Sequence, residues 1–321
     1  MRGRVYTTGA LFTEAEFRLA HGRWVRPLAE APWSNESRPE LPGHLRRLGG
    51  EFFCLPFGGG GAVREPGPGW KDLAKGPVNQ PMHGPAANHD WTIVEYRGNA
   101  VTLALDDTFT SPIKRVERRI TLAPDRPLVD VAISIEMRRQ VRLPIAFHPI
   151  LRLPETPRTL HLDIDFTLGL TYPGVIEPDR MVCEPGTTFT RLAHVPRRLV
   201  GMVDLRSLPF EHRIEDVVML AGIRAPVRAR FTEESFTLEI DWLRTLLPHC
   251  MVWIHDRGAD LEPWAGRFRG LGLEPVASAF DGPWELSASP NPLSALGFPT
   301  AVLLRTESPT RLQCSLWARE L

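Results

Sequence analysis

Lysine is scarce in this chain of 321 residues, because only Lys71, Lys75 and Lys114 among its 38 cationic side chains are lysine. The other cationic side chains are arginine, and 38 aspartate and glutamate residues bring the formal net charge to zero. Proteins that bind nucleic-acid backbones gather a surplus of basic side chains on one face. No such run of arginines occurs here, so we expect no nucleic-acid partner.

Cysteine clusters and long apolar runs are also missing. The four cysteines, Cys54, Cys183, Cys250 and Cys314, are far apart, whereas zinc sites and redox pairs use closely spaced cysteines. We therefore predict buried free thiols and no metal site. No segment approaches the roughly 20 apolar residues that cross a bilayer, and acidic residues follow the short apolar patch near the N-terminus, where a signal peptide would stay apolar. We expect a soluble cytoplasmic protein without a membrane partner.

Helical periodicity is rare, because 31 prolines and 26 glycines interrupt nearly every window that could sustain it. A period of two is common instead, as in residues 159–171, where Leu160, Leu162 and Ile164 alternate with polar side chains. The same alternation predicts strands over 101–105, 128–137, 236–242 and 311–317. Many short strands without helical crossovers indicate antiparallel sheets packed face to face. We predict an all-β fold, a large antiparallel β-sandwich that forms a single domain over residues 1–321.

Two histidines and two glutamates lie in settings that favour a functional role. His83 lies on a loop just before a predicted strand at 91–96, and His148 ends an apolar run at 143–150. Glu274 lies within the apolar run 270–276, and burial there would raise its pKa toward that of a general base. Glu262 is flanked by Asp260 and Arg267, which suits a surface position better. A lone histidine in such a place is more often a core residue than a catalytic one.

Four segments, taken in order, resemble the aldose 1-epimerases of the galactose mutarotase-like superfamily. They are Leu55-Pro56-Phe57-Gly58, the segment 80–84 with Asn88-His89-Asp90-Trp91 behind it, Ile145-Ala146-Phe147-His148-Pro149, and Gly272-Leu273-Glu274-Pro275-Val276. Each segment alone is a weak signal, and their order and spacing carry the resemblance. The resemblance implies a supersandwich fold and a cofactor-independent isomerase that interconverts the α and β anomers of a free sugar.

Mutarotation opens a sugar hemiacetal and closes it on the other face of the aldehyde, so it needs one acid and one base at the anomeric centre. By the resemblance, His148 is the acid that protonates the ring oxygen, and Glu274 is the base that takes the proton of the anomeric hydroxyl. His83 is a substrate-binding helper. We expect His148 and Glu274 to face each other across an open cleft, several ångströms apart, with His83 beside them.

The resemblance also implies an acidic substrate-binding residue in the segment 214–220. Asp216 is favoured, and Glu215 stays open because the register is uncertain by one residue. Asn88 and Trp91, which follow His83 in its motif, complete the predicted substrate-binding set. Further tryptophans are candidate sugar-stacking faces, although tryptophans in a β-sandwich more often belong to the core; these are Trp253, Trp264 and Trp284.

Two departures from the family pattern bear on the substrate. Pro85-Ala86-Ala87 stands where many members carry an aromatic residue and an arginine, which weakens the case for a sugar phosphate substrate. Ile150-Leu151 replaces the usual aromatic pair after the second histidine and puts hexose specificity in question. The alternative is a non-catalytic carbohydrate-binding or sensing protein on the same fold. Either way, the expected partner is a small carbohydrate, and the chain is a monomer or a homodimer.

Overall fold

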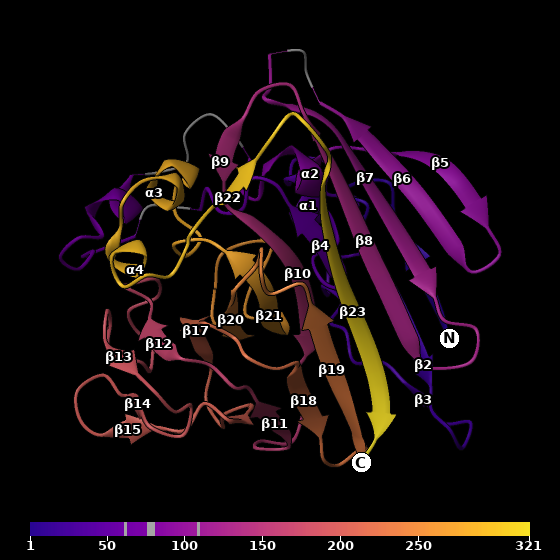
Figure 1. Cartoon of the computed structure of the whole chain (residues 1–321). Coiled ribbons are helices and arrows are strands. Elements are labelled where there is room, and N and C mark those ends of the chain that lie inside the picture. The colour runs from indigo at the N-terminus through magenta and orange to yellow at the C-terminus, as the bar shows by residue number, and fades with distance from the viewer. Residues whose placement is uncertain (61–62, 76–80, 108–109) are drawn as a thin grey trace.

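The computed structural model describes residues 1–60, 63–75, 81–107 and 110–321 of the chain, and strands dominate it (Figure 1). Ten strands form one antiparallel sheet, in which β3 (Trp24–Val25) pairs only with β2. The other nine follow in spatial order: β1 (Arg2–Val5), β2 (Phe12–Arg18), β4 (Glu51–Cys54), β10 (Ile145–Arg152), β21 (Arg269–Ala277), β20 (His249–Asp256), β17 (Ile214–Ala221), β12 (Leu168–Thr171) and β13 (Thr188–Phe189).

A second antiparallel sheet of nine strands packs against the first. Its spatial order is β16 (Ser207–Leu208), β11 (Leu160–Asp163), β18 (Val227–Phe231), β19 (Phe236–Trp242), β23 (Thr310–Glu320), β8 (Leu128–Met137), β7 (Ile113–Leu122), β6 (Ala100–Asp106) and β5 (Thr92–Arg97). Two further pairs are β14 (Val195–Pro196) with β15 (Met202–Val203), and β9 (Val141–Leu143) with β22 (Val302–Leu304). The predicted all-β sandwich is confirmed.

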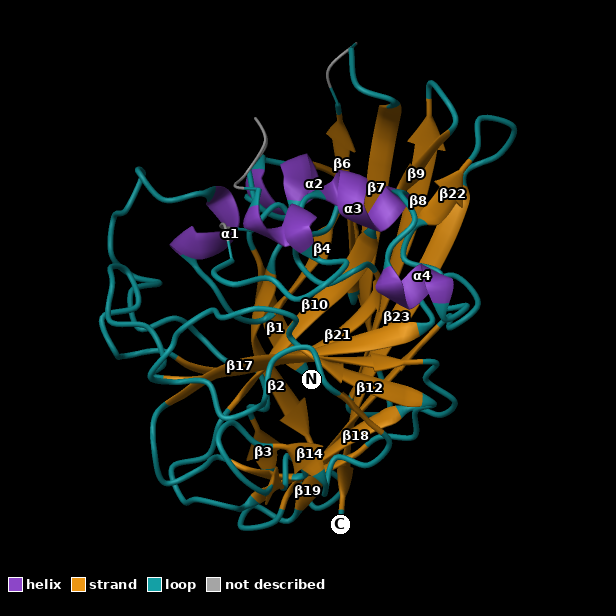
Figure 2. Cartoon of the chain, turned by 90° about the vertical axis from the view of Figure 1, so that its left-hand side faces the viewer, coloured by secondary structure: helices purple, strands orange, loops and turns teal. Residues whose placement is uncertain are grey.

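Helices are few and short, and they lie outside the strand layers (Figure 2). They are α1 (Gly43–Arg46), the 3₁₀ turn η1 (Lys71–Ala74), α2 (Gly84–Asn88), α3 (Trp284–Ala288) and α4 (Pro292–Ala295). In the parts of the chain that the structure describes, no helix is both long and apolar enough to span a bilayer.

The ten-stranded sheet is buried on both faces. Its inner face, which includes Phe53, Phe147 and Leu273, joins the nine-stranded sheet in the larger apolar core. Its outer face, which includes Phe52 and Met251, is covered by loops and short helices in a second apolar cluster. Strands buried on both faces read as nearly continuous apolar runs, which explains why β10 and β21 lack a clear alternation in the sequence.

Strand predictions from alternation were accurate where a strand has one buried face. The strands expected at 128–137 and 236–242 are β8 and β19, with the predicted bounds. The single strand expected at 159–171 is wrong, because the chain forms β11 in the nine-stranded sheet and then crosses to form β12 in the ten-stranded sheet. The four cysteines are free and buried, as predicted.

Candidate active site

His148 and Glu274 lie next to each other on the outer face of the ten-stranded sheet. Residues 146 and 150 of β10 pair with residues 276 and 272 of β21, which places His148 opposite Glu274. The same row continues through Phe52 on β4, the pairing partner of His148, and Met251 on β20, the pairing partner of Glu274. Directly opposed residues of neighbouring strands point to the same face, so strand register alone brings the predicted acid and base together.

The two side chains touch, and both are buried. His148 Nε2 lies 3.4 Å from Glu274 Oε1, which is longer than a normal hydrogen bond. His148 is 4% exposed and Glu274 is 0% exposed. Within the described part of the chain, both carboxylate oxygens of Glu274 and Nδ1 of His148 have no hydrogen-bond partner. Buried polar atoms without partners are rare in folded proteins, so this pair has bonding capacity to offer a ligand.

His83 completes a group of stacked and edge-on rings around His148. The imidazole rings of His83 and His148 lie 5.1 Å apart, edge to face, and Phe52 stacks on His148 at 4.5 Å. On its other sides, His83 lies 5.0 Å from Phe57 and 5.2 Å from His44. His83 Nδ1 is a further buried atom without a hydrogen-bond partner in the described residues.

Burial sets the ionisation of these groups. It lowers the pKa of His148 to about 3, with a smaller contribution from His44. Burial also lowers the pKa of His83 well below its usual range, helped by the two neighbouring histidines. The pKa of Glu274 is raised well above its usual range, chiefly by burial and secondarily by the nearby carboxylate of Asp281. All three shifts favour the neutral form, so the pair is best described as sharing one proton.

Gly272 makes room for the Glu274 carboxylate. A Cβ atom at Gly272 would lie 2.4 Å from Glu274 Oε1 and 3.2 Å from Cβ of Trp253. The carboxylate therefore extends over the glycine toward Trp253, the pairing partner of Gly272 on β20. The Trp253 ring in turn lies 6.3 Å from His148, edge to face, and is only partly buried.

Glu215 shares this outer face. It pairs with His255 on β20, and its carboxylate contacts His255 Nδ1. Trp253 Nε1 donates a hydrogen bond of 2.8 Å to Glu215 Oε1. Glu215 is therefore connected through the Trp253 ring to His148.

Asp216, the favoured substrate-binding residue, points to the opposite face of the sheet. Its Oδ2 accepts hydrogen bonds of 2.9 Å from the backbone amides of Val182 and Cys183, and its Oδ1 accepts one of 3.0 Å from Val217 N. Burial raises its pKa to about 6, while these amides oppose the shift. Since Asp216 anchors the loop at 182–183, the structure brings the alternative residue, Glu215, to the face that carries His148.

Asn88 and Trp91 support the site from behind and do not face it. Asn88 Oδ1 lies 2.9 Å from His44 Nδ1, and Asn88 Nδ2 donates to the carbonyls of Met82 and Gly84 at 2.8 Å. Trp91 is 2% exposed in the core between the sheets, and its indole N–H donates 2.9 Å to Ala86 O. The placement of Trp91 corrects its prediction as a substrate-binding residue. Asn88 instead holds His44, which contacts His83.

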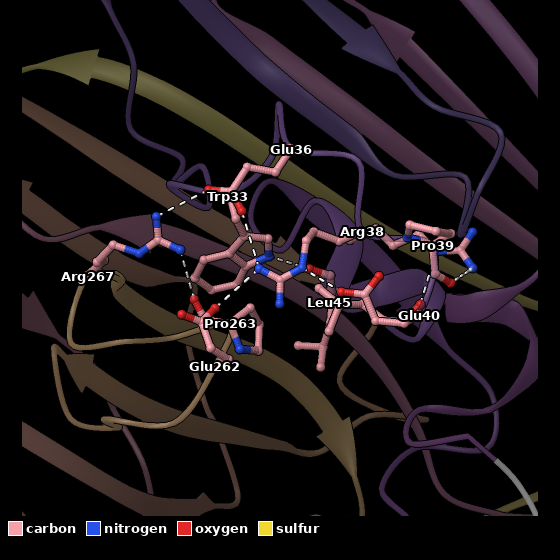
Figure 3. Close-up of polar contacts among 11 residues, drawn as sticks. Trp33, Glu36, Arg38, Pro39, Glu40, Leu45, Glu262, Pro263 and Arg267 are labelled. Atoms are coloured by element: carbon pink, nitrogen blue, oxygen red, sulfur yellow. Dashed lines mark hydrogen bonds and ion pairs between the residues drawn. The ribbon is translucent and has the colours of Figure 1, made fainter.

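An aromatic cluster covers the end of the site near Glu215. The Trp264 ring lies 4.7 Å from the His255 ring, tilted against it, and meets Trp33 edge to face at 5.3 Å. Phe268 stacks on Trp253 at 5.9 Å. The loops that carry Trp33 and Trp264 are far apart in sequence yet lie side by side (Figure 3).

Ion pairs hold these two loops together. Arg38 lies 3.2 Å from Glu262, and Arg267 lies 3.2 Å from Glu36 (Figure 3). The Glu262 side chain is 62% exposed, so this glutamate belongs to the surface, as predicted. Trp33 is fixed beneath these pairs by a hydrogen bond of 2.7 Å from its indole N–H to Leu45 O.

The expected open cleft between His148 and Glu274 is wrong in one respect. The two groups face each other with His83 beside them, but they are in contact and buried. Two aromatic side chains cause this closure, since Phe52 and Trp253 pack directly against His148. Trp253 was a candidate for sugar stacking, whereas Phe52 was not among the predicted site residues. Their signal in the sequence was weak, because aromatic residues in β-sandwiches are usually core.

The sequence analysis also missed His255. It lies on the same face as Trp253, two residues further along β20, and that spacing could have indicated it. Trp284, another candidate for sugar stacking, begins α3 and packs against the larger core. Among the described residues, no group of three or more His, Cys, Asp or Glu side chains is arranged to hold a metal ion.

Solved structures share this arrangement of sheets across almost the whole chain. An aldose epimerase homologue from C. elegans is 13% identical, with a TM-score of 0.63, and the match covers 99% of this chain and 95% of that one. The chain has the galactose mutarotase-like fold. A galactose mutarotase-like protein from Lactobacillus casei is 12% identical, with a TM-score of 0.58 over 99% of this chain and 96% of that one.

A galactose mutarotase-like protein from Clostridium acetobutylicum gives a similar match at 12% identity and a TM-score of 0.58, covering 98% of this chain and 90% of that chain. No protein-family model matches the sequence, and no curated protein matches it either. At these sequence identities the structural likeness establishes the fold and does not establish the chemistry of the site.

Proposed function

We propose that this protein is an aldose 1-epimerase-like isomerase that interconverts the anomers of a free sugar. The observation that carries the proposal is the contact between His148 and Glu274, whose buried polar atoms have no other hydrogen-bond partner in the described chain. A single proton on this pair supplies one acid and one base, which the anomeric centre of a sugar can reach once the substrate has parted the two side chains. His83 adds another unpartnered nitrogen beside them.

The proposed reaction needs no net proton exchange with water. Glu274, as the carboxylate, takes the proton of the anomeric hydroxyl while His148, as the imidazolium, donates a proton to the ring oxygen, and the C1–O5 bond breaks. Rotation about the C1–C2 bond turns the aldehyde, and the reverse transfers close the ring on the other face. Burial raises the pKa of Glu274 and lowers that of His148, so without substrate the shared proton lies on Glu274 and has to move to His148 before this step.

The remaining groups on this face suit a neutral, hydroxyl-rich substrate. Trp253 offers a partly exposed ring beside His148 for the C–H surface of a pyranose. The Glu215 carboxylate, held by Trp253 and His255, is an acceptor for sugar hydroxyls. We assign the role of acidic substrate-binding residue to Glu215 for this reason.

Anomer exchange measured by NMR tests the proposal. Purified protein is added to a panel of aldoses at equilibrium, and the exchange rate between anomers is compared for wild type, Glu274→Gln and Glu262→Gln. We expect exchange above the spontaneous rate for at least one sugar, lost in Glu274→Gln and kept in Glu262→Gln. Equal rates in all three proteins for every sugar would sink the proposal.

A sugar-binding protein without turnover is the second candidate, and one observation favours it. His148 and Glu274 are in contact and buried, so a substrate has to part them before it reaches both. Calorimetric titration with the same panel separates the two candidates. Binding without accelerated exchange supports the binding protein, and the absence of any binding rejects both candidates.

A further inference from the structure

A separate cavity of about 520 Å³ lies between the first two strands and the loops that follow β3. Its wall comes from β1, β2, residues 26–35 and Arg47, which is the residue after α1. Four arginines and three glutamates line it: Arg2, Arg4, Arg26, Arg47, Glu14, Glu16 and Glu30. The cavity shares no lining residue with the row of His148 and Glu274.

A strained β-bulge turns Glu14 toward this cavity. The pairing of β1 with β2 shifts register between Arg2 and Arg4, and Glu14 within β2 has a φ of 50°. A left-handed conformation is unfavourable for a glutamate, and bulges of this kind re-aim side chains at functional sites. The Glu14 carboxylate accepts a hydrogen bond of 3.2 Å from the Tyr6 hydroxyl and lies 2.9 Å from Arg4 Nη1.

The arginines of the cavity are unequally partnered. Arg2 and Arg26 both form ion pairs with Glu16, and Arg4 pairs with Glu14. Arg47 has neither a hydrogen bond nor an ion pair with any residue that the structure describes, and its Nε is buried. Its guanidinium lies over the Tyr6 ring, with Cζ 4.3 Å from the ring centroid.

The groups of the lining that have no ion pair indicate which ligand would fit the cavity. A guanidinium that lies against an aromatic ring and has unused N–H donors matches a phosphate or carboxylate group. Glu30 is the carboxylate of the lining that forms no ion pair within the described chain, and Ser34 and Asn35 add neutral polar groups. These groups bind hydroxyls, and the volume exceeds that of a single inorganic anion.

We propose that this cavity is a second ligand site that binds a small hydroxylated anion, a phosphorylated or carboxylated sugar, through Arg47. The anionic group lies against the Arg47 fork, and the hydroxyls lie against Glu30 and the polar side chains at 34–35. This site is independent of the proposed epimerase chemistry, since its lining excludes His83, His148 and Glu274.

Calorimetric titration of the full chain tests the site with four probes: glucose 6-phosphate, gluconate, glucose and inorganic phosphate. We expect one of the two hydroxylated anions to bind with a dissociation constant below 1 mM, and which one binds tells phosphate from carboxylate. Arg47→Gln should weaken this binding at least tenfold. Arg305→Gln, at an exposed arginine elsewhere, is the matched control and should bind as wild type does.

The Glu274→Gln variant distinguishes this site from the candidate active site. It should bind the anion with unchanged affinity even if it has lost all anomer exchange. Loss of binding in Glu274→Gln would place the ligand on the catalytic face and overturn the proposal. Equal affinities in Arg47→Gln and wild type would overturn it, as would binding of inorganic phosphate alone, which means an adventitious ion only.

Discussion

Two buried pairs on opposite faces of the ten-stranded sheet differ in how fully they are bonded. On the inner face, Arg118 of β7 reaches across to Glu51 of β4, and both side chains are 0% exposed. Arg118 Nη2 contacts Glu51 Oε2 and donates 3.1 Å to the Glu51 carbonyl, while Nη1 lies 3.4 Å from Oε1. On the outer face, His148 and Glu274 make one long contact.

This difference separates a structural pair from the pair that we propose to be reactive. Both carboxylate oxygens of Glu51 contact Arg118. Burial raises the pKa of Glu51, and the Arg118 guanidinium opposes this rise. Both oxygens of Glu274 lack a hydrogen-bond partner in the described chain. A buried pair whose carboxylate oxygens are both engaged links the two sheets, whereas a pair whose carboxylate oxygens have no partner keeps its capacity for a substrate.

The largest expected effect is on catalysis at the outer pair. Glu274→Gln removes the proposed base and should lower the anomer exchange rate by up to about 10⁴-fold. Its folding stability should stay unchanged or rise, because a neutral amide replaces a buried carboxyl without hydrogen bonds. NMR exchange and urea denaturation measure the two quantities. A large loss of stability would mean that Glu274 is structural like Glu51.

At the inner pair the effect should fall on stability alone. Arg118→Met leaves the Glu51 carboxylate buried and unpaired, which should cost about 3–5 kcal/mol in the free energy of unfolding. Arg119→Met, at the neighbouring exposed position of β7, is the matched control and should cost less than about 1 kcal/mol. Urea denaturation of both variants provides the comparison, and similar losses in the two would contradict it.

Removing both partners of the inner pair should restore most of that loss. The double variant Glu51→Leu with Arg118→Met exchanges two buried charges for apolar groups, which is often neutral or stabilising. We expect the free energy of unfolding of the double variant to exceed that of Arg118→Met by about 2 kcal/mol or more. A double variant no more stable than the single one would show that other contacts of Arg118 matter more than its charge.

An effect of similar size is expected on the pH dependence of stability. His148 has a pKa of about 3 in the folded protein and about 6.5 when unfolded. Between these two pKa values the folded state binds fewer protons than the unfolded state. The contribution of His148 to the free energy of unfolding is therefore complete above pH 6.5 and decreases as the pH falls. About 2–3 kcal/mol should be lost between pH 6.5 and 4.5.

Glu274 changes stability in the opposite sense, so the test is made without it. The slope of stability against pH is compared for Glu274→Gln and for Glu274→Gln with His148→Gln, and it should be shallower in the double variant. Parallel slopes would mean that His148 is solvated in the folded state.

The sheets could be predicted from the sequence where alternation was strong. β8 and β19 have one buried face each, and their bounds follow from the pattern alone. The crossing at residues 164–167 could not be predicted, because alternation continues there while the hydrogen-bond partners change from one sheet to the other. An apolar alternation with a period of two indicates which face of a strand is buried, but it does not indicate which sheet the strand joins.

Within the site, His148 and Glu274 face each other with His83 beside them, as expected, while their contact, their burial and the finer choices could not be predicted. Asp216 and Glu215 are adjacent, and a shift of one residue reverses the face of a strand, so the sequence left the choice open. Trp91 lies in the core, where the carbonyl of Ala86 accepts a hydrogen bond from its indole N–H. The closure of the site depends on side chains from four strands, which no local pattern contains.

The room that Gly272 leaves for Glu274 has an evolutionary consequence. A side chain at position 272 would occupy the space of the carboxylate, so the two positions are constrained as a unit. Among homologous chains, we expect glycine at 272 to be lost only where residue 274 is no longer acidic. A collection of relatives sorted by these two positions would then divide the lineage into chains that kept the base and chains that turned the same fold to other uses.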